Sequence, residues 1–202
     1  MERNDLERRA LRMKGAHDAE NLICRYSYYL TAGDWDAILG MFAHDTDEIS
    51  VSVADLGVWK GREGLKRWCG FMADQRGDGA GQLEIHLATN MVIEVAQDGR
   101  TAKAVLVSPG VVTGEREGEY RAAGWEWAKA QLDLVCEDGC WRFRHMKLYE
   151  LIYAPYSHTF VGSARPAPVC PERFAPDGPA EGGCAYRPDG VQTLLPAPPQ
   201  AD

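Results

Sequence analysis

The sequence predicts an α+β domain, in which N-terminal helices pack on a curved, mainly antiparallel sheet, followed by a proline-rich C-terminal tail. Up to Gln75, apolar residues recur at helical spacing, whereas from Leu83 onward apolar and polar residues alternate with a period of two. The segment from Ser163 to Asp202 holds nine of the eleven prolines and has almost no periodicity. We therefore divide the chain into a domain at 1–162 and an extended or disordered tail at 163–202.

The helical part is predicted to contain three helices, over 5–30, 35–45 and 62–75. Gly33 is a candidate C-cap for the first helix, and Asp34 is a candidate N-cap for the second. One side of the first helix gathers apolar and phenolic residues: Leu22, Ile23, Tyr26, Tyr29 and Leu30. We expect this side to pack against the sheet, and Tyr28 to point elsewhere.

The sheet is predicted to begin with a pair of short strands within 48–61, before the third helix. Four longer strands follow at 83–95, 101–114, 124–139 and 140–153, with QDGR and EDGC as hairpin turns. The tail is expected either to be disordered or to cover a neighbour or a pocket mouth, and to contribute little to the stability of the core.

Composition excludes several classes of protein. The 202 residues suffice for one domain with a core, and a net charge of −8 argues against a nucleic-acid groove. The charged N-terminal segment has no apolar h-region and no apolar run reaches membrane-spanning length, so we expect a cytoplasmic protein that binds no membrane. The six cysteines lack paired C-x-x-C spacing and are expected to be thiols, most of them buried and inert.

The chain carries no sequence signature of a metal or nucleotide cofactor. It has no H-E-x-x-H, no EF-hand loop, no G-x-G-x-x-G and no phosphate-binding loop, and it also lacks the G-x-S-x-G elbow of serine hydrolases. We therefore expect no metal and no cofactor, and cofactor-free chemistry on a small, largely apolar molecule.

Four stretches in this order resemble the nuclear-transport-factor-2-like superfamily, in particular its SnoaL-like branch: RYSYYLTAGDWDAILGMFAHD, WKGREGLKRW, HLATNMVIEVAQDGRTAKA and AKAQLDLVCEDGCWRFRHMKLY. The resemblance covers about residues 15 to 160. It implies a cone-shaped half-barrel with a deep apolar pocket between the sheet and the helices. It does not fix the activity, which must be argued from the site.

The resemblance also implies candidate catalytic residues. Dehydratases of this superfamily commonly combine a tyrosine on the first helix, an aspartate after it and a histidine on the sheet, roles that Tyr29, Asp34 and His86 could fill here. Many relatives carry an aspartate where this chain has Thr31, so the acidic partner is either displaced to Asp34 or absent. Asp34 is equally explained as a helix N-cap.

His86 is the sharpest single candidate, because an imidazole can remove a proton beside a carbonyl at neutral pH while a phenol donates to the enolate oxygen. Its orientation is open. Strict alternation in 83–95 puts His86 and Asn90 opposite an apolar row, so His86 points outward if that row faces the helices. A bulge or strong curvature would turn it inward.

Further residues are candidates for substrate binding. His145 shares a strand face with Tyr149, and it could also be a core or interface histidine. The tryptophans Trp125 and Trp127 share a face that lines either the pocket or a partner interface. The complete set expected to bind substrate is Tyr26, Leu30, Asn90, Trp68, Trp125, Trp127, His145 and Tyr149.

Three hypotheses of function follow. The first is a cofactor-independent lyase or isomerase, of the dehydratase, ketosteroid-isomerase or polyketide-cyclase type, acting on a small apolar cyclic substrate. The second is a binding module without turnover, and the third is a structural subunit like the small chain of a ring-hydroxylating dioxygenase. Because the sheet has more apolar surface than one helical layer can cover, we also expect a homodimer or higher homo-oligomer.

Overall fold

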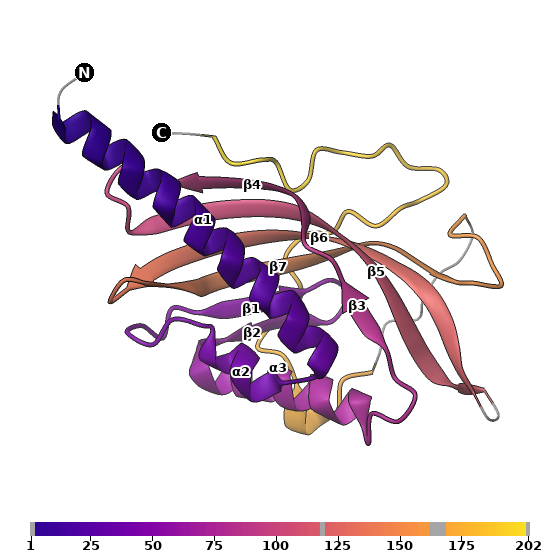
Figure 1. Ribbon diagram of the computed structural model, residues 1–202. Helices are drawn as coiled ribbons and strands as arrows, with labels where there is room; N and C mark the ends of the chain where they lie inside the picture. The colour runs from indigo at the N-terminus through magenta and orange to yellow at the C-terminus, as the bar shows by residue number, and fades with distance from the viewer. Residues whose placement is uncertain (1–2, 118–119, 162–168, 201–202) are drawn as a thin grey trace.

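The computed structural model describes residues 3–117, 120–161 and 169–200. A few helices lie on one side of a curled sheet that does not close, which confirms the predicted α+β class (Figure 1). The helices are α1 (Arg3–Ala32), α2 (Trp35–Gly40), α3 (Gly61–Arg76) and the 3₁₀ turn η1 (Glu172–Phe174). The strands are β1 (Ser50–Val53), β2 (Gly57–Lys60), β3 (Glu84–His86), β4 (Thr89–Val95), β5 (Thr101–Glu117), β6 (Tyr120–Glu137) and β7 (Cys140–Pro155).

The sheet is mixed. Its described strands follow the order β2-β1-β7-β6-β5-β3, and β4 also pairs with β5. β1 and β7 run parallel, whereas the other neighbours are antiparallel. The long strands β5, β6 and β7 form its centre, and register shifts between β6 and β7 at Trp127/Ala128 and Asp133/Leu134 bend it.

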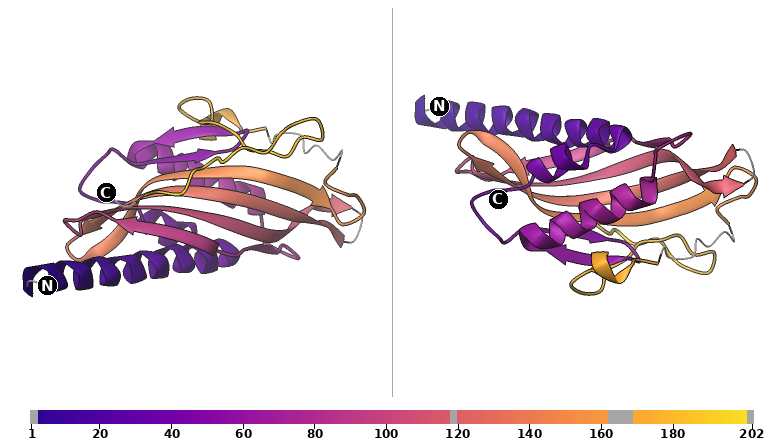
Figure 2. Two further views of the ribbon diagram at one scale, coloured as in Figure 1. Left: turned by 90° about the horizontal axis from the view of Figure 1, so that it is seen from above. Right: turned by 90° about the horizontal axis from the view of Figure 1, so that it is seen from below.

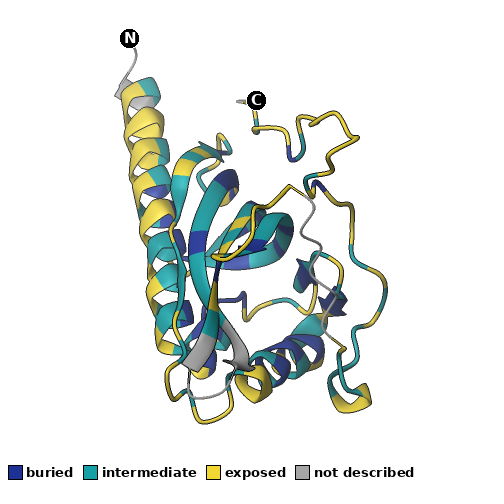
Figure 3. Cartoon of the chain, turned by 90° about the vertical axis from the view of Figure 1, so that its right-hand side faces the viewer, coloured by how far each residue is buried: buried dark blue, intermediate teal, exposed yellow. Residues whose placement is uncertain are grey.

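The core lies between the concave face of the sheet and the three helices. The ring centroid of Phe42, just after α2, lies 5.5 Å from that of Phe143 on β7 and 6.4 Å from that of Trp68 on α3. Trp35 completes this aromatic cluster through an edge contact with Trp68. Burial is concentrated on the inward sides of the helices and strands (Figure 3).

Helix α1 packs on the sheet mainly through its C-terminal half. Ala19, Ile23 and Leu30 are buried there, whereas Leu11 and Met13 nearer the N-terminus are exposed. The first turns project beyond the sheet (Figure 2). In the described part of the chain, no helix is long and apolar enough to cross a membrane.

The described part of the C-terminal tail, 169–200, is extended and packs on the body of the domain. Backbone hydrogen bonds join Gly178 and Asp177 to Val58 on the edge strand β2, at 3.0 and 2.7 Å. The indole N–H of Trp59 donates to the carbonyl of Phe174 at 2.8 Å. Residues 163–168 and 201–202 of the expected tail lie outside the described residues. Because of these contacts, we now expect the tail to contribute to the stability of the domain, in contrast to the expectation from the sequence.

Candidate active site

A cavity of about 830 Å³ lies between the concave face of the sheet, α1 and α3. The helices supply a mainly apolar wall: Ile23, Tyr26, Ser27 and Leu30 from α1, and Trp68, Phe71 and Met72 from α3. The sheet supplies a more polar wall, which includes Glu84, His86, Ser108, Glu126, Glu150 and Tyr153. A partly enclosed, mainly apolar space with a few polar groups is typical of a site for a small organic molecule.

His86 points into this cavity, and a bulge explains why. Glu84 and His86 face inward on β3, and Ala88 continues that row. At Asn90 the backbone has a positive φ of 49°, and the register with β5 shifts between Thr89 and Val92. The bulge moves the inward row by one residue, so that Met91, Ile93 and Val95 pack on the core after it. The apolar row expected over 85–95 is therefore split between two faces.

The imidazole of His86 lies across β5, over Gly110. A Cβ atom at position 110 would come within 2.7 Å of His86 Nδ1 and 2.8 Å of its Cε1. Gly110 is the direct cross-strand partner of His86, so only the absence of a side chain there leaves room for the ring. The His86 side chain is 12% exposed.

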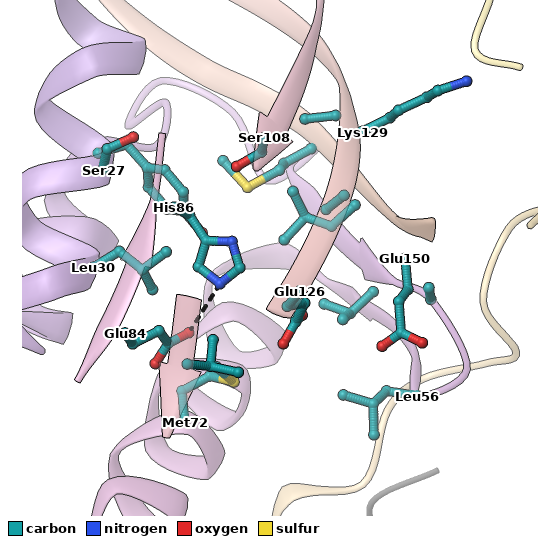
Figure 4. A pocket seen from close by; sticks show the side chains of 18 of the residues that line it. Ser27, Leu30, Leu56, Met72, Glu84, His86, Ser108, Glu126, Lys129 and Glu150 are labelled. Carbon is teal, nitrogen blue, oxygen red and sulfur yellow. Dashed lines mark ion pairs between the residues drawn. The ribbon is translucent and has the colours of Figure 1, made fainter. Parts of the chain in front are cut away.

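The surroundings of His86 favour its neutral form. Burial lowers the pKa of His86 below its ordinary value, and the negative charge of Glu126 offsets part of this effect. Glu84 lies on the same strand, with its Oε1 atom 3.8 Å from His86 Nε2 (Figure 4). A neutral imidazole in an apolar cavity is the form that can accept a proton.

Tyr26, rather than Tyr29, is the α1 tyrosine that lines the cavity. Ile23, Tyr26 and Leu30 form one stripe of the helix. Tyr29 is partly buried against the core but lies outside the set of cavity-lining residues, so the expected pairing of Tyr29 with His86 is not what the structure shows. Tyr28 is 79% exposed, as expected.

The Tyr26 phenol is held in its protonated form. Burial raises the pKa of Tyr26 far above its ordinary value, and the negative charge of Glu84 raises it further. The ring packs edge-on against Phe143, with the centroids 5.8 Å apart. A protonated phenol is a hydrogen-bond donor to a substrate oxygen.

Asp34 lies outside the cavity and caps a helix. Its Oδ1 atom accepts a hydrogen bond from the backbone N–H of Ala37 at 3.0 Å, at the start of α2. The hydroxyl of Thr31 donates to the carbonyl of Ser27 at 3.0 Å, one turn back on α1. This end of α1 therefore places no carboxylate beside His86, and the carboxylates near the imidazole come from the sheet.

The structure separates the remaining sequence-based candidates. Leu30 and Trp68 line the cavity, whereas Asn90 is exposed at the bulge. His145 lies in a separate depression of about 460 Å³ lined by charged residues, and its Nδ1 atom is 2.9 Å from Ser50 Oγ. Burial lowers the pKa of His145 as well.

Three aromatic candidates also lie outside the set of cavity-lining residues. Tyr149 is buried and donates its hydroxyl to Gln131 at 3.1 Å. Trp125 and Trp127 are 44% and 38% exposed, because on β6 the residue between them, Glu126, is the one that faces the cavity. The alternation W-E-W thus turns the partly buried acidic side chain toward the cavity and exposes the aromatic ones.

Sequence reasoning missed the acidic residues of the site. Glu84 and His86 are two residues apart in a strand, so their side chains lie on the same face. This spacing could have predicted that Glu84 accompanies His86. Glu150 gave no such signal, because the register shifts place extra residues on β7 and change which of its residues face inward. Glu126 continues the inward row of Ala128 and Ala130 on β6, but the flanking tryptophans drew attention to the other face of the strand.

The site offers no evident place for a metal ion. Among the described residues, no group of three or more His, Cys, Asp or Glu side chains is arranged to hold one, and all six cysteines are free.

Helices packed on a curled, unclosed sheet with a cavity between them define the nuclear-transport-factor-2-like fold. The sequence also identifies the family within this fold. A model of the SnoaL-like domain matches residues 16–147, so the chain belongs to the SnoaL-like family. This confirms the resemblance seen in the sequence. No match was found among curated proteins.

Solved structures share the fold at low sequence identity. A candidate scytalone dehydratase from Novosphingobium aromaticivorans is 20% identical, with 82% of this chain and 94% of that chain covered and a TM-score of 0.57. A LinA-type3 hexachlorocyclohexane dehydrochlorinase from Novosphingobium barchaimii is 17% identical, with coverage of 77% and 96% and a TM-score of 0.57. An NTF2-like protein with a cystatin-like fold from Novosphingobium aromaticivorans is 17% identical, with coverage of 74% and 90% and a TM-score of 0.55. At these identities the likeness shows the fold alone.

Proposed function

We propose that this protein is a cofactor-independent lyase or isomerase that removes a proton beside a carbonyl group of a small, cyclic, largely apolar substrate. The observation that carries the proposal is the largely buried imidazole of His86, which faces a cavity with an apolar wall and whose pKa is lowered by burial. The names of two structures with the same fold, a candidate dehydratase and a dehydrochlorinase, describe eliminations. Loss of a proton is part of any such elimination.

In the proposed reaction, His86 accepts the proton of a C–H bond adjacent to the substrate carbonyl. The electron pair of that bond moves onto the carbonyl oxygen, where the Tyr26 hydroxyl donates a hydrogen bond to the enolate. The imidazolium then returns its proton. If the proton goes to a β-hydroxyl, water leaves and a double bond forms. In a β,γ-unsaturated ketone, return of the proton to the γ carbon shifts the double bond into conjugation with the carbonyl.

The walls of the cavity fit a substrate of this kind. Leu30, Trp68 and Met72 offer apolar surface opposite the polar strands, and Figure 4 shows His86 between the helix side and the strand that carries Glu126. Enclosure by these side chains lowers the local dielectric constant, which strengthens the hydrogen bond from Tyr26 to a developing charge.

Proton abstraction can be tested without knowing the physiological substrate. The protein is incubated in D₂O with a panel of cyclic ketones and β-hydroxy ketones, and α-proton exchange and new alkene signals are followed by NMR. We expect exchange with at least one cyclic ketone, and losses of about 100-fold or more in His86→Asn and about 100-fold in Tyr26→Phe. Tyr28→Phe is the control, because Tyr28 is exposed and outside the set of cavity-lining residues. Equal exchange rates in wild type and His86→Asn would contradict the proposal.

A non-catalytic binding module is the second candidate. It is favoured by the 3.8 Å between Glu84 and His86, which is longer than a hydrogen bond, and by Thr31 at the helix position where relatives carry an aspartate. In that case the same ketones should bind, with saturable shifts of the cavity resonances, but should not exchange their protons.

A further inference from the structure

His86 and Glu126 face each other across one strand. On β5, Gly110 pairs with His86 of β3 on one side and with Glu126 of β6 on the other. His86 and Glu126 both line the cavity. Adjacent strands lie about 4.8 Å apart, so two side chains separated by one strand meet only if the residue between them is small and one of them leans across.

The structure meets both conditions. Gly110 has no side chain, and the imidazole leans over it, with Nδ1 and Cε1 only 2.7 and 2.8 Å from the place where a Cβ atom would lie. The negative charge of Glu126 raises the pKa of this imidazole, against the lowering by burial. Figure 4 shows its carboxylate on the opposite side of the ring from the α1 side chains.

We infer that Glu126 is a positioning residue for His86: its carboxylate faces the imidazole across Gly110 and stabilises the imidazolium that forms when His86 accepts a proton. This inference rests on the proposed function and assigns a role within the same site. In this role Glu126 takes no proton from the substrate, and the proton moves only between the substrate and His86.

The other titratable groups around His86 come from several elements. Glu84 on β3 lies 3.8 Å from Nε2, Tyr26 faces the cavity from α1, and Glu150 lines it from β7. Lys129 lines the cavity from β6 and Tyr153 from β7, and Asp55 and His158 line it from exposed positions. Of the carboxylates on the neighbouring strands, Glu126 shares the cross-strand row of His86, whereas Glu150 pairs with Ala128 in the next row.

The position of Glu126 predicts how His86 titrates in the protein without substrate. The measurement is the ¹³C–¹H resonance of each histidine Cε1 against pH, with His86 assigned by its absence in His86→Asn. We expect Glu126→Gln to move the His86 midpoint to lower pH, because a negative charge that favours the imidazolium is lost. Glu150→Gln removes a carboxylate from the same cavity and is the matched control, with a smaller expected shift. Glu126→Asp keeps the charge on a shorter side chain and should give an intermediate midpoint.

The role of Gly110 is tested separately. Gly110→Ala places a methyl group 2.7 Å from His86 Nδ1 and 2.7 Å from the carbonyl oxygen of Ile85. The His86 ring and the neighbouring part of β3 should therefore move, so the chemical shift and midpoint of His86 should change even though every charge is kept. If Glu126→Gln and Glu126→Asp both leave the His86 midpoint at the wild-type value, or if Glu150→Gln shifts it as much as Glu126→Gln does, the inference is wrong. These outcomes are independent of turnover, so they are distinguishable from a failure of proton abstraction in the ketone panel.

Discussion

Asp177, in the C-terminal tail, accepts a hydrogen bond from the backbone N–H of Lys60, the residue that caps the N-terminus of α3. The bond is 2.8 Å long, and Lys60 makes no side-chain cap bond of its own. Asp177 also pairs with Arg67 on α3 at 2.5 Å. A carboxylate at this end of a helix satisfies an otherwise unpaired N–H and complements the helix dipole. The tail therefore stabilises the helix that carries Trp68 and Met72 into the cavity.

Replacing Asp177 by Ala should lower the free energy of unfolding by about 1 kcal/mol, the usual cost of losing a helix cap. Urea unfolding followed by circular dichroism measures this. Asp189→Ala is the matched control, because Asp189 is also in the tail and, within the described part of the chain, pairs with the nearby, exposed Arg187. Equal stability of the two variants would show that the Asp177 contact contributes nothing measurable.

A chain that ends at Val169 should be less stable by about 4 kcal/mol. It loses two backbone bonds to Val58, the bond from the Trp59 indole to Phe174 and the Asp177 cap of α3, each contributing about 1 kcal/mol. The loss also leaves the edge of β2 unpaired, which favours aggregation. A chain that ends at Arg187 keeps these bonds and serves as the control. If the melting temperature of the shorter chain is within a few degrees of wild type, the tail contributes little to the stability of the core, as the sequence suggested.

The sequence predicted the parts of the fold that depend on local periodicity. The amphipathic side of α1 identified Tyr26 and Leu30, and the change to a period of two located the sheet. It could not predict the face on which His86 lies, because one extra residue at Asn90 reverses the parity of the strand. A positive φ at a single asparagine leaves almost no signal in the sequence.

Contacts between residues far apart in the chain could not be predicted from the sequence either. The pairing of Asp177 with Lys60 joins residues far apart in the chain, and the tail around Asp177 shows no pattern to reveal it. Glu126 was overlooked because the two flanking tryptophans suggested a buried apolar face, whereas here the charged residue is the one that faces the cavity. Gly110 opposite His86 becomes meaningful only once the register is known.

The pH dependence of stability should reveal the buried neutral His86. Its pKa is lowered in the folded protein, so below the unfolded value of about 6.5 the unfolded chain binds more protons, and stability falls as the pH decreases toward the folded pKa. The slope from one such group is at most about 1.4 kcal/mol per pH unit. In His86→Gln this contribution is absent, so the stability of wild type relative to the variant should decrease from pH 7 to pH 5.

Urea unfolding across this range measures the difference. His145 also has a lowered pKa but is present in both proteins, so its contribution cancels when the two curves are subtracted. His17→Gln, at an exposed position on α1, is the control for the loss of any imidazole. A constant difference between wild type and His86→Gln at every pH would contradict burial of a neutral His86.

The convex face of the sheet should mediate self-association. Trp125, Trp127 and Tyr156 are exposed there, and the rings of Trp125 and Tyr156 contact each other with centroids 5.0 Å apart. Exposed aromatic clusters of this kind mark association surfaces. We therefore expect light scattering coupled to size exclusion at micromolar protein to give a multiple of the 22.4 kDa chain mass.

The variant Trp127→Glu should reduce that mass to one chain, because a charge in the centre of the aromatic cluster would have to be desolvated on association. Val191→Glu introduces the same charge at an exposed apolar residue of the tail and should leave the oligomer intact. Circular dichroism confirms that both variants are folded. A wild-type protein that elutes as a single chain of 22.4 kDa would remove the expectation of an oligomer, and an oligomer that persists in Trp127→Glu would place its interface elsewhere.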